Sequence, residues 1–263
     1  LVPAMGCTEP IAIAYGAAKA REILGCLPDT VEVEASGNII KNVKSVVVPN
    51  TDGLKGIEAA AAAGIVAGQA DKILEVISSV TDADKAAIRT YLDTHEIQVR
   101  PAESDIIFDI ILTLRAGASY VKLRISNYHT NIVHAEKNGR VLLEAGHTAE
   151  HIQASTLTDR SCMSIEGILD FVETMDIDDV RELIERQISY NSKIAQAGIE
   201  ENWGANVGSV LLHHYGNDVK IRARAMAAAG SDARMSGCEL PVIIVSGSGN
   251  QGITASVPVI EYA

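Results

Sequence analysis

The chain has 263 residues, long enough to bury a substantial core in one large domain or two modest ones. Hydrophobic residues make up 47% and charged residues 21%, and 34 acidic against 22 basic residues give a net charge of -12. This charge would repel a phosphate backbone or an acidic membrane surface, and no apolar run reaches the roughly 18 residues that span a bilayer. We therefore expect a cytoplasmic globular protein without nucleic-acid or membrane partners.

The first half of the chain predicts a helix followed by a sheet. Residues 11–24 are rich in alanine with apolar residues at helical spacing, so we expect a helix with Gly6-Cys-Thr-Glu-Pro10 at its N-terminus. Small residues over 54–70 predict a helix that packs closely, and 82–93 predict a short amphipathic helix after Thr81. Strands are expected at 31–35, 46–48, 106–114, 121–125, 132–135 and 141–143, the last two joined by a hairpin at Asn138-Gly139.

From about Ser164 onward the pattern is helical. Asp176 and Asp179 resemble a capping box, an apolar stripe follows at 180–188, and further helices are expected over 203–215 and 218–229. We predict an α+β fold in which a mostly antiparallel sheet lobe with flanking helices (29–147) is inserted into a helical domain (1–28 and 148–263).

A glycine-rich turn, Gly247-Ser-Gly249-Asn-Gln-Gly252, follows an apolar run and matches G-x-G-x-x-G. A dinucleotide site needs this turn inside a βαβ unit with an acidic residue about 20 positions on, and only 11 residues follow Gly252. Pro258 also falls where an uninterrupted helix should run. We favour a carboxylate site at a helix N-terminus, formed by Ser246, Ser248, Asn250 and Gln251 with the glycine amides; a purely structural turn remains open.

Residues 147–151 read His-Thr-Ala-Glu-His and match the zinc motif H-x-x-E-H. Two histidines four residues apart share a helix face and can bind zinc together. The match is short and no third ligand can be named. We therefore assign no metal-binding residue and interpret this segment as a polar connection between the two lobes.

Cys7 is the most informative of four cysteines, none of which forms a C-x-x-C pair. It precedes the first predicted helix, so the helix dipole should lower its pKa and favour the thiolate that a base or nucleophile needs. We interpret Cys26, Cys162 and Cys238 as small structural hydrophobes. His129 and Asn131, just before a predicted strand, either reach a substrate pocket or cap a turn.

Four blocks occur together in one order: Met5-Gly-Cys-Thr-Glu-Pro-Ile-Ala, His129-Thr-Asn-Ile-Val, Gly230-Ser-Asp-Ala-Arg-Met, and Ser246-Gly-Ser-Gly-Asn-Gln-Gly-Ile-Thr-Ala. This set resembles the L-cysteine desulfidase family, also called the serine dehydratase alpha-subunit-like family, over essentially the whole chain. The resemblance implies a lyase that eliminates the β-substituent of a small amino acid without pyridoxal phosphate. L-Cysteine would give pyruvate, ammonia and hydrogen sulfide, or L-serine would be deaminated.

The resemblance also implies the site and the cofactor. Cys7 matches the family's proposed base, while Thr8, Glu9, His129, Asn131 and the turn would bind the amino acid. Members use a 4Fe-4S cluster whose cysteine ligands follow the glycine-rich block, and this chain ends soon after it. We therefore expect a C-terminally truncated chain that lacks the cluster itself, and a homo-oligomer. The alternative is a non-catalytic amino-acid-binding or regulatory module, in which the sheet lobe senses a ligand.

Overall fold

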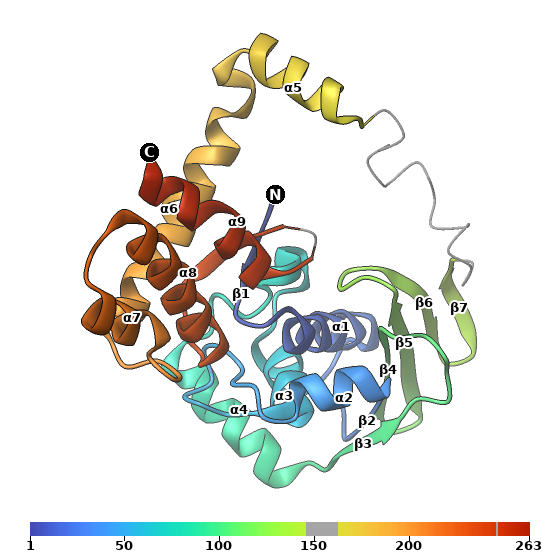
Figure 1. Cartoon of the computed structure of the whole chain (residues 1–263). Helices are drawn as coiled ribbons and strands as arrows, with labels where there is room; N and C mark the ends of the chain where they lie inside the picture. The colour runs from blue at the N-terminus through green and yellow to red at the C-terminus, as the bar shows by residue number, and fades with distance from the viewer. Residues whose placement is uncertain (146–162, 246) are drawn as a thin grey trace.

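The computed structural model describes residues 1–145, 163–245 and 247–263, and its fold is α+β, as the sequence predicts (Figure 1). The strands are β1 Val2–Met5, β2 Thr30–Ala35, β3 Ile97–Pro101, β4 Asp109–Ala116, β5 Ser119–Ser126, β6 Ile132–Lys137, β7 Arg140–Glu144 and β8 Pro241–Ile244. The helices are α1 Thr8–Leu24, α2 Gly37–Val43, α3 Gly56–Ala67, the 3-10 helix η1 Ala70–Glu75, α4 Asp82–Thr94, α5 Ile165–Thr174, α6 Ile177–Glu200, α7 Val207–Tyr215, α8 Val219–Met235 and α9 Gly249–Tyr262.

The larger sheet has the strand order β3-β2-β4-β5-β6-β7 and is antiparallel except for the parallel pair β2–β3. Along β5 the side chains of Val121, Leu123 and Ile125 are buried, while the residues between them are partly exposed. This alternation is that of a sheet with one covered face. The hairpin between β6 and β7 turns at Asn138 and Gly139, both with positive φ, which confirms the predicted turn.

Helix α1 covers this sheet and packs on α3, so the two form a layer between the sheet and helices α6–α9 (Figure 1). A Cβ at Gly64 of α3 would lie 2.1 Å from the carbonyl oxygen of Ala14 in α1. Only glycine allows this close approach, which confirms the predicted helix of small residues. The domain boundaries 1–28, 29–147 and 148–263 stay a prediction, and they separate α1 from the sheet on which it packs.

In the helical part, α6, α7 and α9 pack around α8, and β8 pairs antiparallel with β1 in a two-stranded sheet. The buried side chain of Asn191 on α6 holds β8 in place. Its Oδ1 accepts from Ile243 N at 2.8 Å, and its Nδ2 donates to Ile243 O at 3.3 Å and to Ser256 Oγ at 2.9 Å. One polar side chain thus ties together the three elements α6, β8 and α9.

Several expectations about local structure were wrong. Residues 46–48 form no strand, because Pro49 lacks an N–H and Asn50 turns the chain with positive φ, which leaves only a bridge between Val47 and Lys55. Asp176 caps α6 through Asp178 N without the reciprocal bond of a capping box. Helix α9 continues through Pro258, whose fixed φ suits a helix although one hydrogen bond is lost. Strands β1 and β3 were not predicted.

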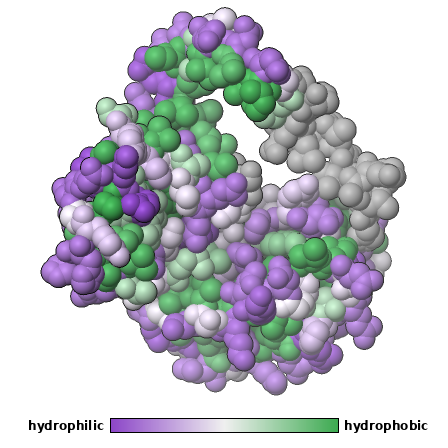
Figure 2. Space-filling model, in the orientation of Figure 1, coloured by the Kyte–Doolittle hydropathy of each residue, from purple (hydrophilic) through white to green (hydrophobic). Residues whose placement is uncertain are grey.

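Apolar side chains are exposed over α5 and the adjoining α6 (Figure 2). Helix α5 buries none of its residues, and Phe171 and Val172 are 52% and 58% exposed. The predicted stripe on α6 is also exposed at Leu183, Ile184 and Ile188. Among the described helices, none is long and apolar enough to cross a membrane.

Candidate functional site

The N-terminal ends of α1 and α9, the first and the last helix described, lie close to each other. Strand β1 leads into α1 and its partner β8 leads into α9 (Figure 1). The hydroxyl oxygen of Thr8 lies 3.5 Å from the carbonyl oxygen of Gly247, at the limit of a hydrogen bond, and so links positions 239 residues apart. The structure therefore brings together the Cys7–Glu9 segment and the glycine-rich turn, as an anion site at helix N-termini requires.

Cys7 is the N-cap residue of α1, and its side chain is buried. Its Sγ donates a hydrogen bond to Glu9 Oε2 at 3.0 Å, and the hydroxyl of Thr8 donates to the same oxygen at 3.2 Å. The predicted helix start is confirmed, with Pro10 in the first turn, where its missing N–H costs nothing.

The expected low pKa of Cys7 is wrong. Burial, together with the charge and the hydrogen bond of Glu9, raises the pKa of this thiol from its ordinary 9.0 to about 12 and outweighs the lowering effect of Arg234. Glu9 behaves oppositely: burial raises its pKa, but hydrogen bonds from Cys7 and Thr8 and the nearby His129 outweigh this and lower it. At neutral pH the pair is a thiol that donates to a carboxylate.

His129 lies in the β5–β6 connection, half-buried, with its ring edge-to-face against Phe108 at 4.6 Å between centroids. Burial lowers its pKa, although Glu9 acts in the other direction, so the imidazole is neutral at pH 7. A Cβ on Gly247 would lie 3.8 Å from His129 Cε1, so the glycine-rich turn passes over this ring. Asn131 donates from Nδ2 to Ser126 O at 2.9 Å and thereby holds the loop that carries His129.

At each glycine of G-x-G-x-x-G a side chain would be unfavourable, for a different steric reason. Gly247 has φ +76°, in the left-handed region; a Cβ at Gly249 would lie 2.2 Å from Arg234 Nε; and a Cβ at Gly252 would lie 2.0 Å from Ile243 O. Ser248 Oγ caps α9 by accepting from Gln251 N. Because β8 pairs only with β1, antiparallel, within the described residues, this turn is not part of a parallel βαβ unit.

Arg234, in the last turn of α8, is the site residue that sequence reasoning missed. It is only 4% exposed, and Nη1 donates to Asn250 Oδ1 at 3.0 Å. It interacts electrostatically with Cys7, Glu9 and His129. The Gly230–Met235 block contains this arginine, but charged residues are seldom buried and nothing in the block predicts that this one is.

The remaining candidates fall into two groups: some lie at the start of α9 or are separate cysteines, and others lie outside the described residues. Gln251 is exposed on the first turn of α9, and Asn250 is half-buried with its side-chain oxygen on Arg234. Ser246, Cys162 and the His147–His151 motif lie outside the described residues. Of the other cysteines, Cys238 is buried, as expected of a structural hydrophobe, and Cys26 is exposed.

The described residues do not fit an iron–sulfur cluster. Such a cluster is held by several cysteine thiolates. Nowhere in residues 1–145, 163–245 and 247–263 do three or more histidine, cysteine or acidic side chains gather in a geometry that could hold a metal. A cluster therefore stays a prediction for a longer protein, and no chemical step below is assigned to one.

The protein-family description "Serine dehydratase alpha chain" matches residues 71–263 of the chain. The chain belongs to this family. Within the serine dehydratase alpha chain match lie His129, Arg234 and the glycine-rich turn, whereas Cys7 and Glu9 precede it. That Cys7 and Glu9 lie close to the glycine-rich turn is therefore a finding of the structure.

Several relatives match the chain over its whole length. Those from Desulfitobacterium hafniense, Lachnoclostridium phytofermentans and Fusobacterium nucleatum are 67%, 53% and 47% identical, and each is described as a UPF0597 protein. The chain spans 61–62% of the length of these relatives. No solved structure matches it.

Proposed function

We propose that the chain carries the substrate-binding and proton-abstracting part of a lyase that acts on a small amino acid. The reaction would be β-elimination without pyridoxal phosphate: L-cysteine to pyruvate, ammonia and hydrogen sulfide, or the deamination of L-serine. The observation that carries the proposal is the hydrogen-bonded pair of the buried Cys7 thiol and the half-buried Glu9 carboxylate, at a helix N-terminus and beside the glycine-rich turn. Membership of the serine dehydratase alpha chain family supports it.

The proton path follows from the protonation states of the pair. Cys7 is a thiol at neutral pH, so it can accept the α-proton of the substrate only if its own proton moves to Glu9, 3.0 Å away. The C–H bond breaks and its electron pair forms the Cα=Cβ bond of an aminoacrylate, while the Cβ–S or Cβ–O bond breaks and its electron pair leaves with the sulfur or oxygen as hydrosulfide or hydroxide. The aminoacrylate tautomerises to an imine, which water hydrolyses to pyruvate and ammonia. Cys7 is then the catalytic base, and Glu9 holds the proton that Cys7 gives up.

The substrate would lie between the two helix N-termini. Thr8, Ser248, Asn250 and the amides of the glycine-rich turn are proposed to hold its carboxylate, because unpaired N–H groups at a helix start favour an anion. Neutral His129 faces the same turn and can donate or accept a hydrogen bond. The partner is thus a small amino acid, and a homo-oligomer stays a prediction that sedimentation velocity would test.

The test is pyruvate formation from L-cysteine and L-serine by the 263-residue chain and by a full-length relative, prepared anaerobically with iron and sulfide. In a relative that has cysteine at the positions aligned with Cys7 and Cys26, alanine in place of the first should abolish turnover and leave the unfolding temperature unchanged, and alanine in place of the second, exposed in this chain, should keep both. Absence of pyruvate with both substrates would overturn the lyase proposal.

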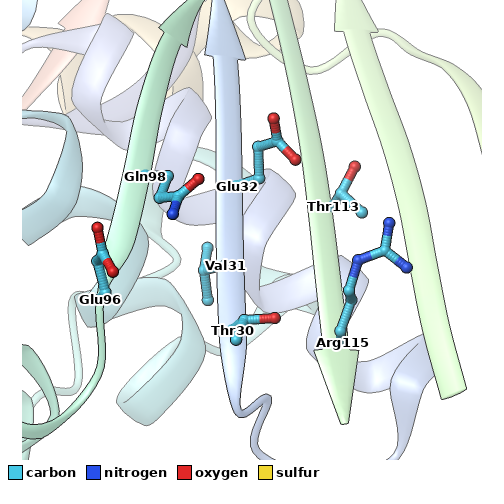
Figure 3. A pocket seen from close by; sticks show the side chains of 7 residues that line it. All are labelled: Thr30, Val31, Glu32, Glu96, Gln98, Thr113 and Arg115. Carbon is cyan, nitrogen blue, oxygen red and sulfur yellow. The ribbon is translucent and has the colours of Figure 1, made fainter. Parts of the chain in front are cut away.

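The alternative, an amino-acid-binding module without catalysis, rests on a polar pocket of the sheet lobe. This pocket lies over β2, β3 and β4 (Figure 3), and Glu32, Glu96 and Arg115 give it charges of both signs, as a zwitterion would need. Calorimetry with L-serine would separate the two proposals. Binding that is lost in Arg115→Gln and kept in Cys7→Ala, with an inactive full-length relative, would favour the module.

A further inference from the structure

Arg234 is a buried guanidinium without an ion pair in the described part of the chain. The residue is only 4% exposed, and its Nε, which has lost contact with water, meets no hydrogen-bond acceptor there. Nη1 donates to Asn250 Oδ1 at 3.0 Å and contacts Met235 Sδ at 3.6 Å, both neutral groups. Nothing described within ion-pair distance therefore neutralises this positive charge.

Such an arrangement is costly unless an anion completes it. Burying a charged group without a partner strongly destabilises a fold. The chain nevertheless presses this guanidinium against the first residue of α9, where a Cβ on Gly249 would lie 2.2 Å from Nε and 2.9 Å from Nη2. Because residue 249 is a glycine, the guanidinium can lie directly against the first residue of α9.

We propose that Arg234 and the first amides of α9 bind the carboxylate of the amino acid. A guanidinium beside unpaired helix N–H groups provides two kinds of donor to one carboxylate. Glu9 interacts electrostatically with Arg234 and supplies the opposite charge for the ammonium group of a zwitterion. This inference rests on the proposed function for the identity of the ligand as an amino acid, and it adds that the carboxylate is required for binding.

The test compares Arg234→Met with Arg224→Met. Arg224 lies on the same helix, is exposed, and donates from Nε to the backbone oxygen of Lys220. Calorimetry would measure the binding of L-serine and of 2-aminoethanol, which lacks the carboxylate. The unaltered chain should bind L-serine at least about tenfold more tightly than 2-aminoethanol, and Arg234→Met should lose at least about tenfold in affinity for L-serine. Arg224→Met should bind as the unaltered chain does.

Thermal unfolding separates a ligand-binding arginine from a structural one. Arg234→Met removes an unpaired buried charge, so its unfolding temperature should stay equal or rise, whereas loss of a structural arginine would lower it. Should Arg234→Met not fold, Arg234→Lys keeps the charge and loses the planar fork, and it should fold and bind L-serine more weakly. Unaltered L-serine affinity in the folded variant, or no L-serine binding by the unaltered chain, overturns the proposal.

This outcome is independent of the lyase test. If a full-length relative forms no pyruvate while the Arg234 variants lose affinity as described, the lyase proposal fails and the carboxylate site stands. If pyruvate forms and Arg234→Met keeps the L-serine affinity of the unaltered chain, the carboxylate site fails and the lyase proposal stands.

Discussion

The thiol of Cys7 donates its hydrogen bond to the carboxylate of Glu9, with 3.0 Å between Sγ and Oε2. Only one residue separates them, and both belong to the start of α1, so the helix itself sets their distance. The contact holds the thiol in its protonated form and the carboxylate in its charged form. The basicity at this site therefore depends on both residues together. We make four predictions about this pair and the elements around it.

Replacing Glu9 by Gln should lower the pKa of Cys7, because this removes the negative charge of Glu9 and the hydrogen bond to its carboxylate, which both raise that pKa. Burial would still raise the pKa of Cys7 in the variant. The alkylation rate of Cys7 as a function of pH, followed by peptide mass spectrometry, measures this. The midpoint should move down from about 12 towards 9.0 without reaching it. Exposed Cys26 provides the internal control, and an unmoved midpoint for Cys7 would contradict the assignment.

Protein stability should decline at alkaline pH through Cys7. Its pKa is raised in the folded state, so the stabilising contribution is complete below the unfolded pKa near 9.0 and is lost as the pH rises towards about 12. The difference in unfolding free energy between the unaltered chain and Cys7→Ser should change by about 1.4 kcal/mol per pH unit in this range. Urea unfolding at pH 8.0, 9.5 and 10.5 measures it; a difference independent of pH would refute the raised pKa.

Gly249→Ala should displace Arg234 and reduce L-serine affinity by about tenfold or more, since the new Cβ would lie 2.2 Å from Nε. The matched control is Gly37→Ala. Gly37 is likewise the first residue of a helix with a serine N-cap, and a Cβ there would contact nothing within 4 Å. The control should bind L-serine normally; equal loss in both variants would mean that the crowding of Arg234 is irrelevant.

Asn191→Leu should destabilise the fold, because the N–H of Ile243 loses its buried acceptor and Ser256 loses a donor. We expect a loss of about 2–4 kcal/mol in the free energy of unfolding, measured in urea. Gln196→Ala, on an exposed position of the same helix, should change it by less than about 0.5 kcal/mol. A similar small change in both would show that Asn191 does not anchor β8.

Local sequence patterns predicted much of the fold. Asn138-Gly139 predicts its hairpin because both residues accept positive φ, and the small residues of α3 predict a close helix contact because they leave room for the backbone of α1. Strand β3 was missed, since it pairs in parallel with β2, 66 positions away, and no local signal marks such a pairing.

The sequence by itself determined that Cys7 stands at a helix N-terminus and that the glycine-rich turn opens another helix, because start signals and turn residues act over a few positions. Only the tertiary structure decided the chemistry of the site. The pKa of Cys7 rises because folding removes it from water, and Arg234 joins the site because α8 ends against the start of α9. Burial and the meeting of distant segments depend on how the whole chain packs, so no short pattern encodes them.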